Sequence, residues 1–135
     1  MADAALLYVH KRVEGAFLNA LLAIAASARA KYPASMGDAS AFYEYLKGTE
    51  ADRFSFEFRG MPEKLAKILY KWMRCELAHE GTLPIDIKIV PDKEPKRYFI
   101  QAGGGPEKTL KISESYFHRL MEYADGIFND KQPKA

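Results

Sequence analysis

The feature that most constrains the fold is a long helical pattern near the start of the chain. Apolar residues recur at intervals of three and four between residues 3 and 31, which predicts one amphipathic helix of that length. The pattern includes Leu6, Val9, Val13, Phe17, Leu21, Ile24 and Ala28, and it is widened by Leu7, Leu18, Leu22 and Ala25. A proline at position 33 ends the helix, because the residue before a proline is pushed out of the helical region. So wide an apolar face predicts contacts on more than one side.

Shorter patterns in the next part of the chain predict two more helices. Asp38 is a suitable N-cap for a short helix that Gly48 ends. The segment 53–58 alternates phenylalanine with polar residues, which fits a short strand or an irregular segment that fills the core. Pro62 then favours the start of a third helix, which Gly81 ends.

The last third of the chain mixes strand and helix patterns. Alternation over 85–90 is the clearest strand signal, and 97–101 and 109–112 are further candidates. Ser113 is placed as the N-cap of a final amphipathic helix.

Together these elements predict a mainly α fold: a bundle of about four helices with a small β-hairpin or three-stranded insertion before the last helix. The predicted organisation is a single domain over residues 1–130, with the β insertion at 84–112 and a frayed tail at 131–135.

Composition limits the class of protein. The chain has 135 residues, of which 48% are hydrophobic and 28% charged, an ordinary balance for one soluble domain. The net charge of +2 is too small to argue for nucleic-acid binding by itself. Cys75 is the one cysteine, so no disulfide can form within the chain and a reducing cytoplasm is expected. The apolar run 16–30 is interrupted and shorter than a membrane span, so no membrane partner is predicted.

Candidate chemistry lies at the end of the third predicted helix, in the segment Leu69-Tyr70-Lys71-Trp72-Met73-Arg74-Cys75-Glu76-Leu77-Ala78-His79-Glu80-Gly81. Arginine is a permanent cation that can bind a phosphate through two hydrogen bonds, and histidine exchanges a proton near neutral pH. Arg74 and His79 are therefore the candidate catalytic pair. Glu76 precedes His79 by three positions and could orient the imidazole.

Helical geometry assigns these side chains to faces. At about 100° per residue, Tyr70 lies beside Arg74, whereas His79 and Glu76 fall about 140° away or beyond, on the apolar side. An apolar stripe that becomes polar in its last turn indicates a cleft or a subunit interface. Cys75 and His79 lie four positions apart and could form a nucleophilic or metal-binding pair. No third ligand spacing is visible, so no metal or cofactor is predicted.

The segment from Leu69 to Gly81 resembles the signature helix of HEPN domains (higher eukaryotes and prokaryotes nucleotide-binding), in which four to six residues separate an arginine from a histidine. The resemblance implies an all-α fold, usually a homodimer paired through this helix. Many members are metal-independent RNases of toxin or anti-phage systems, so the resemblance implies Arg74 and His79 as the active pair. It also implies RNA as substrate and a cognate antitoxin as a further partner. Cys75 stands where competent members often have asparagine, aspartate or histidine.

The implied reaction is transesterification of RNA. His79 would deprotonate the 2′-hydroxyl or protonate the leaving 5′-oxygen, and Arg74 would neutralise charge on the phosphorane. The product would be a 2′,3′-cyclic phosphate, and DNA would not be cut because it lacks the 2′-hydroxyl.

Two other functions remain open. The first is a non-catalytic domain of the same kind that binds a nucleotide or RNA, with Arg74 as the phosphate anchor. The second is a protein-interaction or scaffold domain, in which Glu76 and His79 are ordinary interface groups. Tyr70 could contact a base or phosphate beside Arg74, or simply be a boundary aromatic residue.

Overall fold

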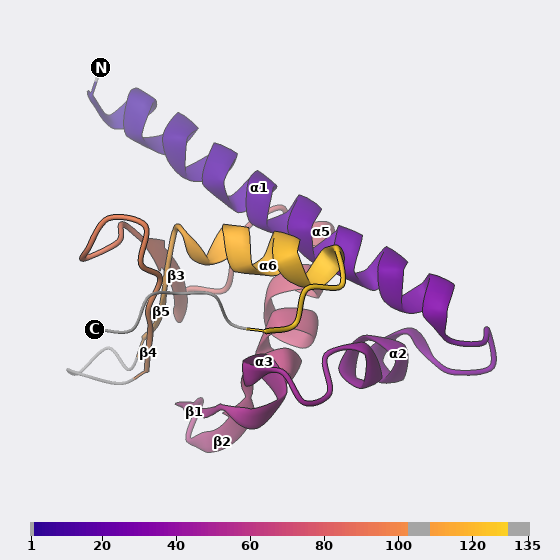
Figure 1. Cartoon of the computed structure of the whole chain (residues 1–135). Helices are drawn as coiled ribbons and strands as arrows, with labels where there is room; N and C mark the ends of the chain where they lie inside the picture. The colour runs from indigo at the N-terminus through magenta and orange to yellow at the C-terminus, as the bar shows by residue number, and fades with distance from the viewer. Residues whose placement is uncertain (1, 103–108, 130–135) are drawn as a thin grey trace.

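The computed structural model describes residues 2–102 and 109–129, with side chains from residue 12 onward. The elements follow one another in the order α1 (Ala2–Lys31), α2 (Asp38–Tyr45), α3 (Glu50–Arg53), β1 (Ser55–Phe58), β2 (Met61–Lys64), α4 (Leu65–Lys67), η1 (Ile68–Arg74), α5 (Cys75–Glu80), β3 (Ile87–Val90), β4 (Ile100–Gln101), β5 (Leu110–Ser113) and α6 (Tyr116–Ala124). Figure 1 shows α1 crossing the whole molecule, with α6 beside it and the sheet of β3, β4 and β5 at one end.

Helix α1 organises the helical part of the molecule. It packs on α2, η1, α5 and α6, as its wide apolar face predicts. Phe17, Leu21, Ile24 and Ala28 are buried on this face. Their spacing of three and four residues is the period that holds one helix face against a core.

The stretch 12–31 of α1 is long and apolar enough to cross a membrane by length and composition. The core helix of a soluble protein passes the same test, and α1 is buried along one face against four other helical elements. The described structure is therefore consistent with a soluble protein.

A β-hairpin replaces the start of the predicted third helix. β1 and β2 pair antiparallel, with Ser55 opposite Lys64 and Phe58 opposite Met61. Arg59 and Gly60 form the turn, and both have positive φ. Pro62 therefore lies in a strand, and the helix begins at Leu65. Pro62 lacks an N–H but tolerates an edge position, which a two-stranded hairpin provides.

The helix that follows changes its winding. After the single turn of α4, residues 68–74 form a π-helix, and α5 continues as an α-helix to Glu80. The wider π turns advance by fewer degrees per residue than an α-helix does. Side chains beyond them therefore leave the faces that a 3.6-residue period predicts. Gly81 ends α5 with φ +75°, the left-handed conformation that favours glycine.

The second sheet has three strands in the order β3-β5-β4. β3 and β5 are parallel, with Ile87 opposite Leu110 and Ile89 opposite Ile112, and β4 pairs antiparallel with β5. All four of these apolar side chains are buried in the same hydrophobic cluster as the helices. The sheet is therefore one wall of the main core.

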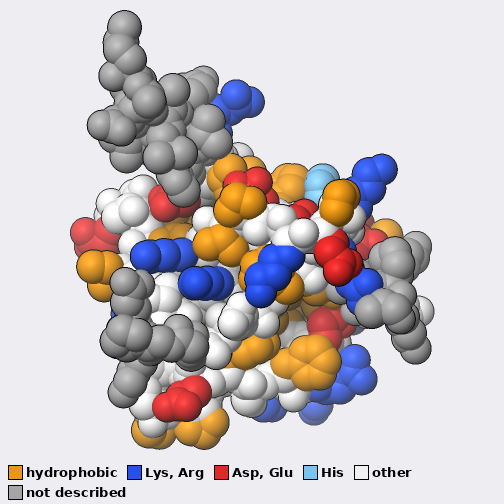
Figure 2. Space-filling model, turned by 90° about the vertical axis from the view of Figure 1, so that its left-hand side faces the viewer, with side chains coloured by type: hydrophobic (Ala, Val, Ile, Leu, Met, Phe, Trp, Pro, Cys, Tyr) orange, Lys and Arg blue, Asp and Glu red, His pale blue; other side chains and the backbone are white. Residues whose placement is uncertain are grey.

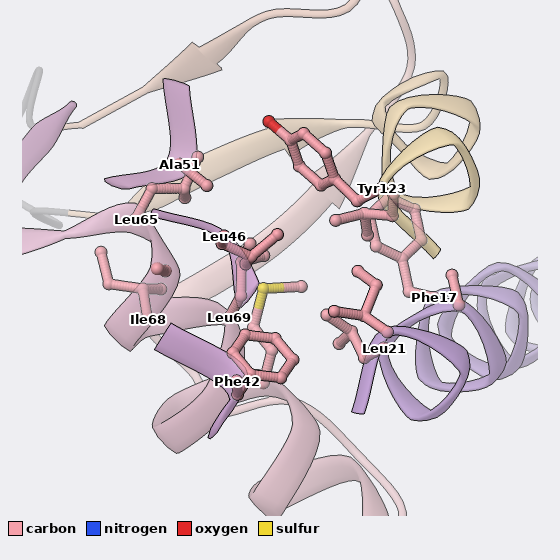
Figure 3. Packing of buried hydrophobic residues seen from close by; sticks show 14 of the residues in the cluster. Phe17, Leu21, Phe42, Leu46, Ala51, Leu65, Ile68, Leu69 and Tyr123 are labelled. Atoms are coloured by element: carbon pink, nitrogen blue, oxygen red, sulfur yellow. The ribbon is translucent and has the colours of Figure 1, made fainter. Parts of the chain in front are cut away.

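The core fills the space between α1, α6, η1 and the short helices. Figure 3 shows Phe17 and Leu21 of α1 facing Phe42, Leu46 and Leu69, with Tyr123 of α6 above Phe17. These side chains are fully buried.

The predicted fold class is wrong. The described residues form a mixed α/β domain with about five helices and two small sheets, in place of a four-helix bundle carrying an insertion. The physical reason is that the buried faces of β3 and β5 pack into the same core as the helices, and that the 55–64 hairpin removes residues from the third helix. The tail at 131–135 lies outside the described residues.

Two predicted caps are also wrong. Gly37 is the N-cap of α2, and Asp38 is its first helical residue. Ser115, not Ser113, is the N-cap of α6. Ser113 ends β5, where its buried hydroxyl accepts a hydrogen bond of 2.8 Å from the Phe99 N–H. Serine that can bond to the backbone of a neighbouring strand need not cap a helix.

Candidate functional site

Arg74 ends the π-helix and points toward α1 and α2. Together with residues of those two helices it lines a pocket of about 290 Å³. The other lining residues are Leu22, Ala25, Ala26 and Arg29 of α1, and Asp38 and Ala41 of α2. The alanines leave room there because they carry the smallest side chains that a helix favours. The pocket is at the lower end of the size range of ligand sites.

The Arg74 side chain is half-buried and held from two sides. Its guanidinium carbon lies 5.0 Å from the centre of the Tyr70 ring, a cation–π contact. Its Nη1 lies 3.9 Å from the sulfur of Cys75, which makes a weak hydrogen bond. Tyr70 in turn packs on the rings of Phe42 and Tyr43, at 5.1 and 5.8 Å between ring centres. This packing fixes where the guanidinium lies.

Arg74 makes few hydrogen bonds with the described residues. Its Nε–H is buried and has no hydrogen-bond partner among the described residues. No carboxylate in the described part of the chain forms an ion pair with it, whereas the buried Arg119 pairs with Glu50. A guanidinium has five N–H donors, and burying them without acceptors costs free energy. An anion in the pocket would offer acceptors to those N–H groups of Arg74 that face it.

Arg29 provides a second cation at the same pocket. Its Nη1 donates to a carboxylate oxygen of Asp38 at 2.8 Å, and its Nη2 donates to the carbonyl oxygen of Pro33 at 2.6 Å. Both side chains of the Arg29–Asp38 pair are substantially exposed, at 34% and 67%. An exposed ion pair contributes only about 0–1 kcal/mol, so a bound anion can compete with Asp38 for Arg29.

His79 and Glu76 do not join this pocket. His79 is exposed near the end of α5, and no hydrogen bond or ion pair links it to Glu76 within the described residues. Glu76 is half-buried and lies near Arg59. The hydrogen bond to Asp86 is the main cause that raises the pKa of Arg59, and the negative charge of Glu76 adds a smaller increase. The expectation that His79 lies on the apolar side is wrong, because the π turns rotate α5 and its last turn extends past the core.

Sequence reasoning therefore found Arg74, Tyr70 and Cys75, which the structure brings together, and missed Arg29 and Asp38. A signal for the latter pair was present. Arg29 follows Leu22, Ala25 and Ala26 at helical spacing, so the four share one face of α1. Nothing in the local pattern indicates that this face meets η1 in particular. Among the described residues, no group of three or more histidine, cysteine or acidic side chains could hold a metal ion.

Comparison with known proteins gives one match. A family model described as Rv1289 matches residues 3–124. No curated protein and no solved structure matches the chain. The family description names no activity and does not link the chain to HEPN domains, so that resemblance stays a prediction. Because the family model covers nearly the whole chain, this protein belongs to the Rv1289 family.

Proposed function

We propose that this protein binds a small phosphate ester, such as a mononucleotide, in the pocket between α1, α2 and η1. The observation that carries the proposal is the half-buried Arg74 guanidinium, whose buried Nε–H has no acceptor among the described residues. Arginine pairs with phosphate through two parallel hydrogen bonds, so one phosphate group can satisfy it.

The rest of the pocket fits the remainder of such a ligand. Arg29 adds a second positive charge for the phosphate. Leu22 is 40% exposed at the pocket, which gives an apolar contact for a sugar or a base. The pocket's small volume favours a single phosphate ester over a longer ligand. This is the non-catalytic alternative that the sequence left open, now with a second arginine.

Calorimetric titration with AMP, adenosine and inorganic phosphate tests the proposal. AMP should bind, and adenosine should bind far more weakly because it lacks the anion. Arg74→Ala should weaken AMP binding by about tenfold to a hundredfold, since a hydrogen bond to a charged group is worth about 1.5–3 kcal/mol. Arg53→Ala is the matched control, because Arg53 is an exposed arginine on α3 and does not line the pocket. Equal affinity of Arg74→Ala and the parent protein would contradict the proposal.

RNA cleavage is a second candidate. The observation that favours it is the exposure of His79, which leaves the imidazole accessible to a substrate or to a second copy of the chain. A catalytic site would then require Arg74 and His79 of two copies to meet. The purified protein should cleave mixed RNA in EDTA to 2′,3′-cyclic phosphates and leave DNA intact. Undiminished cleavage by both Arg74→Ala and His79→Ala would remove this pair from the reaction.

The proposals also extend to the cellular location of the protein and to its partners. We infer a cytoplasmic protein, because Cys75 is the one cysteine of the chain and a reducing compartment suits it. A homodimer through the Arg74-bearing helix and a cognate antitoxin belong to the RNA-cleavage proposal. Sedimentation of the purified protein tests the dimer.

A further inference from the structure

The pocket between α1, α2 and η1 contains a carboxylate as well as two arginines. Asp38, the first residue of α2, lines the pocket together with Arg29 and Arg74. A carboxylate repels a phosphate, so a pocket that contacted only the phosphate of its ligand would bind more tightly without one. Asp38 is therefore better explained by a contact with another part of the ligand.

One oxygen of this carboxylate is held in place by Arg29. The Oδ1 atom of Asp38 accepts a hydrogen bond from Nη1 of Arg29 at 2.8 Å. The Nη2 atom of the same guanidinium donates to the carbonyl oxygen of Pro33 at 2.6 Å. Arg29 is thus fixed between two acceptors and orients the carboxylate. Its positive charge also offsets the repulsion between Asp38 and a bound phosphate.

The other oxygen of Asp38 can accept hydrogen bonds from a ligand. Within the described part of the chain, no hydrogen bond reaches Oδ2, and the side chain is 67% exposed. An ionised carboxylate has about four acceptor positions on its two oxygens. In dinucleotide-binding folds, an acidic side chain uses such positions to bind the 2′-hydroxyl of a ribose. Asp38 has the chemistry for the same contact.

Position in the pocket distinguishes Asp38 from an ordinary surface carboxylate. The face at the sheet end of the molecule shows Lys and Arg side chains interspersed with Asp and Glu side chains (Figure 2). Oppositely charged neighbours are therefore common on this protein, and the Arg29–Asp38 pair alone would not indicate a ligand. Asp38, however, lines the same pocket as the buried Nε–H of Arg74, which has no acceptor among the described residues.

Arg74 and Asp38 are held by different parts of α2. Arg74 lies on the ring of Tyr70, which packs on Phe42 and Tyr43. Those two aromatic residues follow Asp38 by about one helical turn. A phosphate on Arg74 and a sugar on Asp38 can therefore occupy neighbouring parts of the pocket.

We propose that Asp38 binds the ribose of the ligand, so that the pocket selects ribonucleoside 5′-monophosphates. The 5′-phosphate lies on Arg74, and the neighbouring 2′- and 3′-hydroxyls donate to the Asp38 carboxylate. This inference rests on the proposed phosphate site and names the class of ligand that the site takes. A 2′-deoxyribonucleotide keeps the phosphate contact but lacks one hydroxyl donor to Asp38.

Calorimetric titration with AMP and 2′-deoxy-AMP tests the inference. The parent protein should bind AMP about tenfold more tightly, as expected for one hydrogen bond to a charged group that water can reach. Asp38→Ala should bind the two nucleotides equally. Glu44→Ala is the matched control and should keep the preference, because Glu44 is an exposed carboxylate of the same helix that does not line the pocket. Circular dichroism and thermal unfolding establish that each variant folds.

The ratio of the two affinities is the decisive readout. Asp38→Ala also releases Arg29 from its ion pair, which changes the binding of both nucleotides by the same factor and leaves their ratio unaffected. Arg74→Ala should weaken both nucleotides equally, because it removes only the phosphate contact. The ratio therefore reports the contact with the ribose separately from the contact with the phosphate.

Two results would overturn the inference while the phosphate site stands. The first is equal affinity of the parent protein for AMP and 2′-deoxy-AMP, which would show that Asp38 only competes with the phosphate for Arg29. The second is a preference for AMP that Asp38→Ala retains, which would place the ribose elsewhere. Failure of both nucleotides to bind the parent protein would overturn the proposed function together with this inference.

Discussion

At the scale of single residues, the most strongly held side chain is Arg119 of α6. Its side chain is 1% exposed and pairs through Nε and Nη2 with the carboxylate of Glu50, which is also buried. It also donates to the carbonyl oxygens of Ile127, Phe128 and Asn129, at 3.3, 2.6 and 3.1 Å. One guanidinium thus joins α3 to the segment that follows α6. A fully buried charge needs this many partners.

Glu50→Gln should be strongly destabilising, because it removes the buried counter-ion of Arg119 and leaves the guanidinium with only the partly exposed carboxylate of Glu122, at 3.1 Å. The expected loss in the free energy of unfolding is about 3–5 kcal/mol, measured by urea denaturation. Lys67→Gln is the control, since it breaks the exposed Lys67–Glu63 pair and should cost less than about 1 kcal/mol. Similar losses for the two variants would show that the buried pair does not stabilise the fold.

The same carboxylate predicts a dependence on pH. Burial of Glu50 opposes its ionisation and is the largest influence, but the hydrogen bonds from Arg119 and smaller effects outweigh it and lower its pKa below 4.5. A carboxylate with a lowered folded pKa stabilises the fold above its unfolded pKa, and this contribution is lost as the pH falls through the folded pKa.

Unfolding free energy should therefore fall as the pH drops below about 4.5. Glu50→Gln should show a smaller fall, measured by urea denaturation across the pH series. Some acid sensitivity should persist in the variant, because hydrogen bonding also lowers the pKa values of Asp52 and Asp86. Identical pH profiles of variant and parent would contradict the assignment to Glu50.

At the scale of elements, one helix was predicted closely from the sequence and another was predicted poorly. The α1 helix was predicted almost to its ends, because a long run of one period leaves no alternative. The third helix was predicted from Pro62 as a regular α-helix, yet it begins at Leu65 and contains a π-helix. Leu65, Ile68 and Leu69 fit both windings, so their pattern could not distinguish them.

Replacement by alanine should have opposite effects at two glycines, one inside a helix and one just after a helix. Gly15 lies inside α1 with open space around an added Cβ, so Gly15→Ala should stabilise by about 0.5–1 kcal/mol. Gly81 also has space, but its φ of +75° at the end of α5 strains any other residue, so Gly81→Ala should destabilise by about 1 kcal/mol. Thermal unfolding should show a higher melting temperature for Gly15→Ala and a lower one for Gly81→Ala. Melting temperatures that change in the same direction would refute the argument from backbone conformation.

At the scale of the whole molecule, sequence reasoning located strands before the last helix but not their role. Period-2 alternation identifies which residues point inward, yet it does not show which strands pair or what they cover. The parallel pairing of β3 with β5 joins residues more than 20 positions apart. The Arg74 pocket also depends on a contact between distant parts of the sequence, because the packing of α1 on η1 brings Arg29 and Arg74 to the same pocket. Long-range contacts of this kind leave no local pattern.

The pocket is built from one chain, which predicts how binding depends on assembly. All seven of its lining residues belong to α1, α2 and η1 of the same molecule. AMP should therefore bind one per chain, with an affinity that does not change when sedimentation shows a different oligomeric state. An affinity that rises with protein concentration would indicate a site completed by a second copy.

The most direct test of the account is the NMR resonance of the Arg74 Nε–H during titration with AMP. This group is buried and lacks an acceptor among the described residues, so a phosphate in the pocket should give it one. The account predicts that AMP causes a large, saturable shift of this resonance and that adenosine causes none. The resonance is assigned to Arg74 because it should be missing from the spectrum of Arg74→Lys. A resonance that stays fixed while AMP binds would place the ligand elsewhere and contradict the central claim.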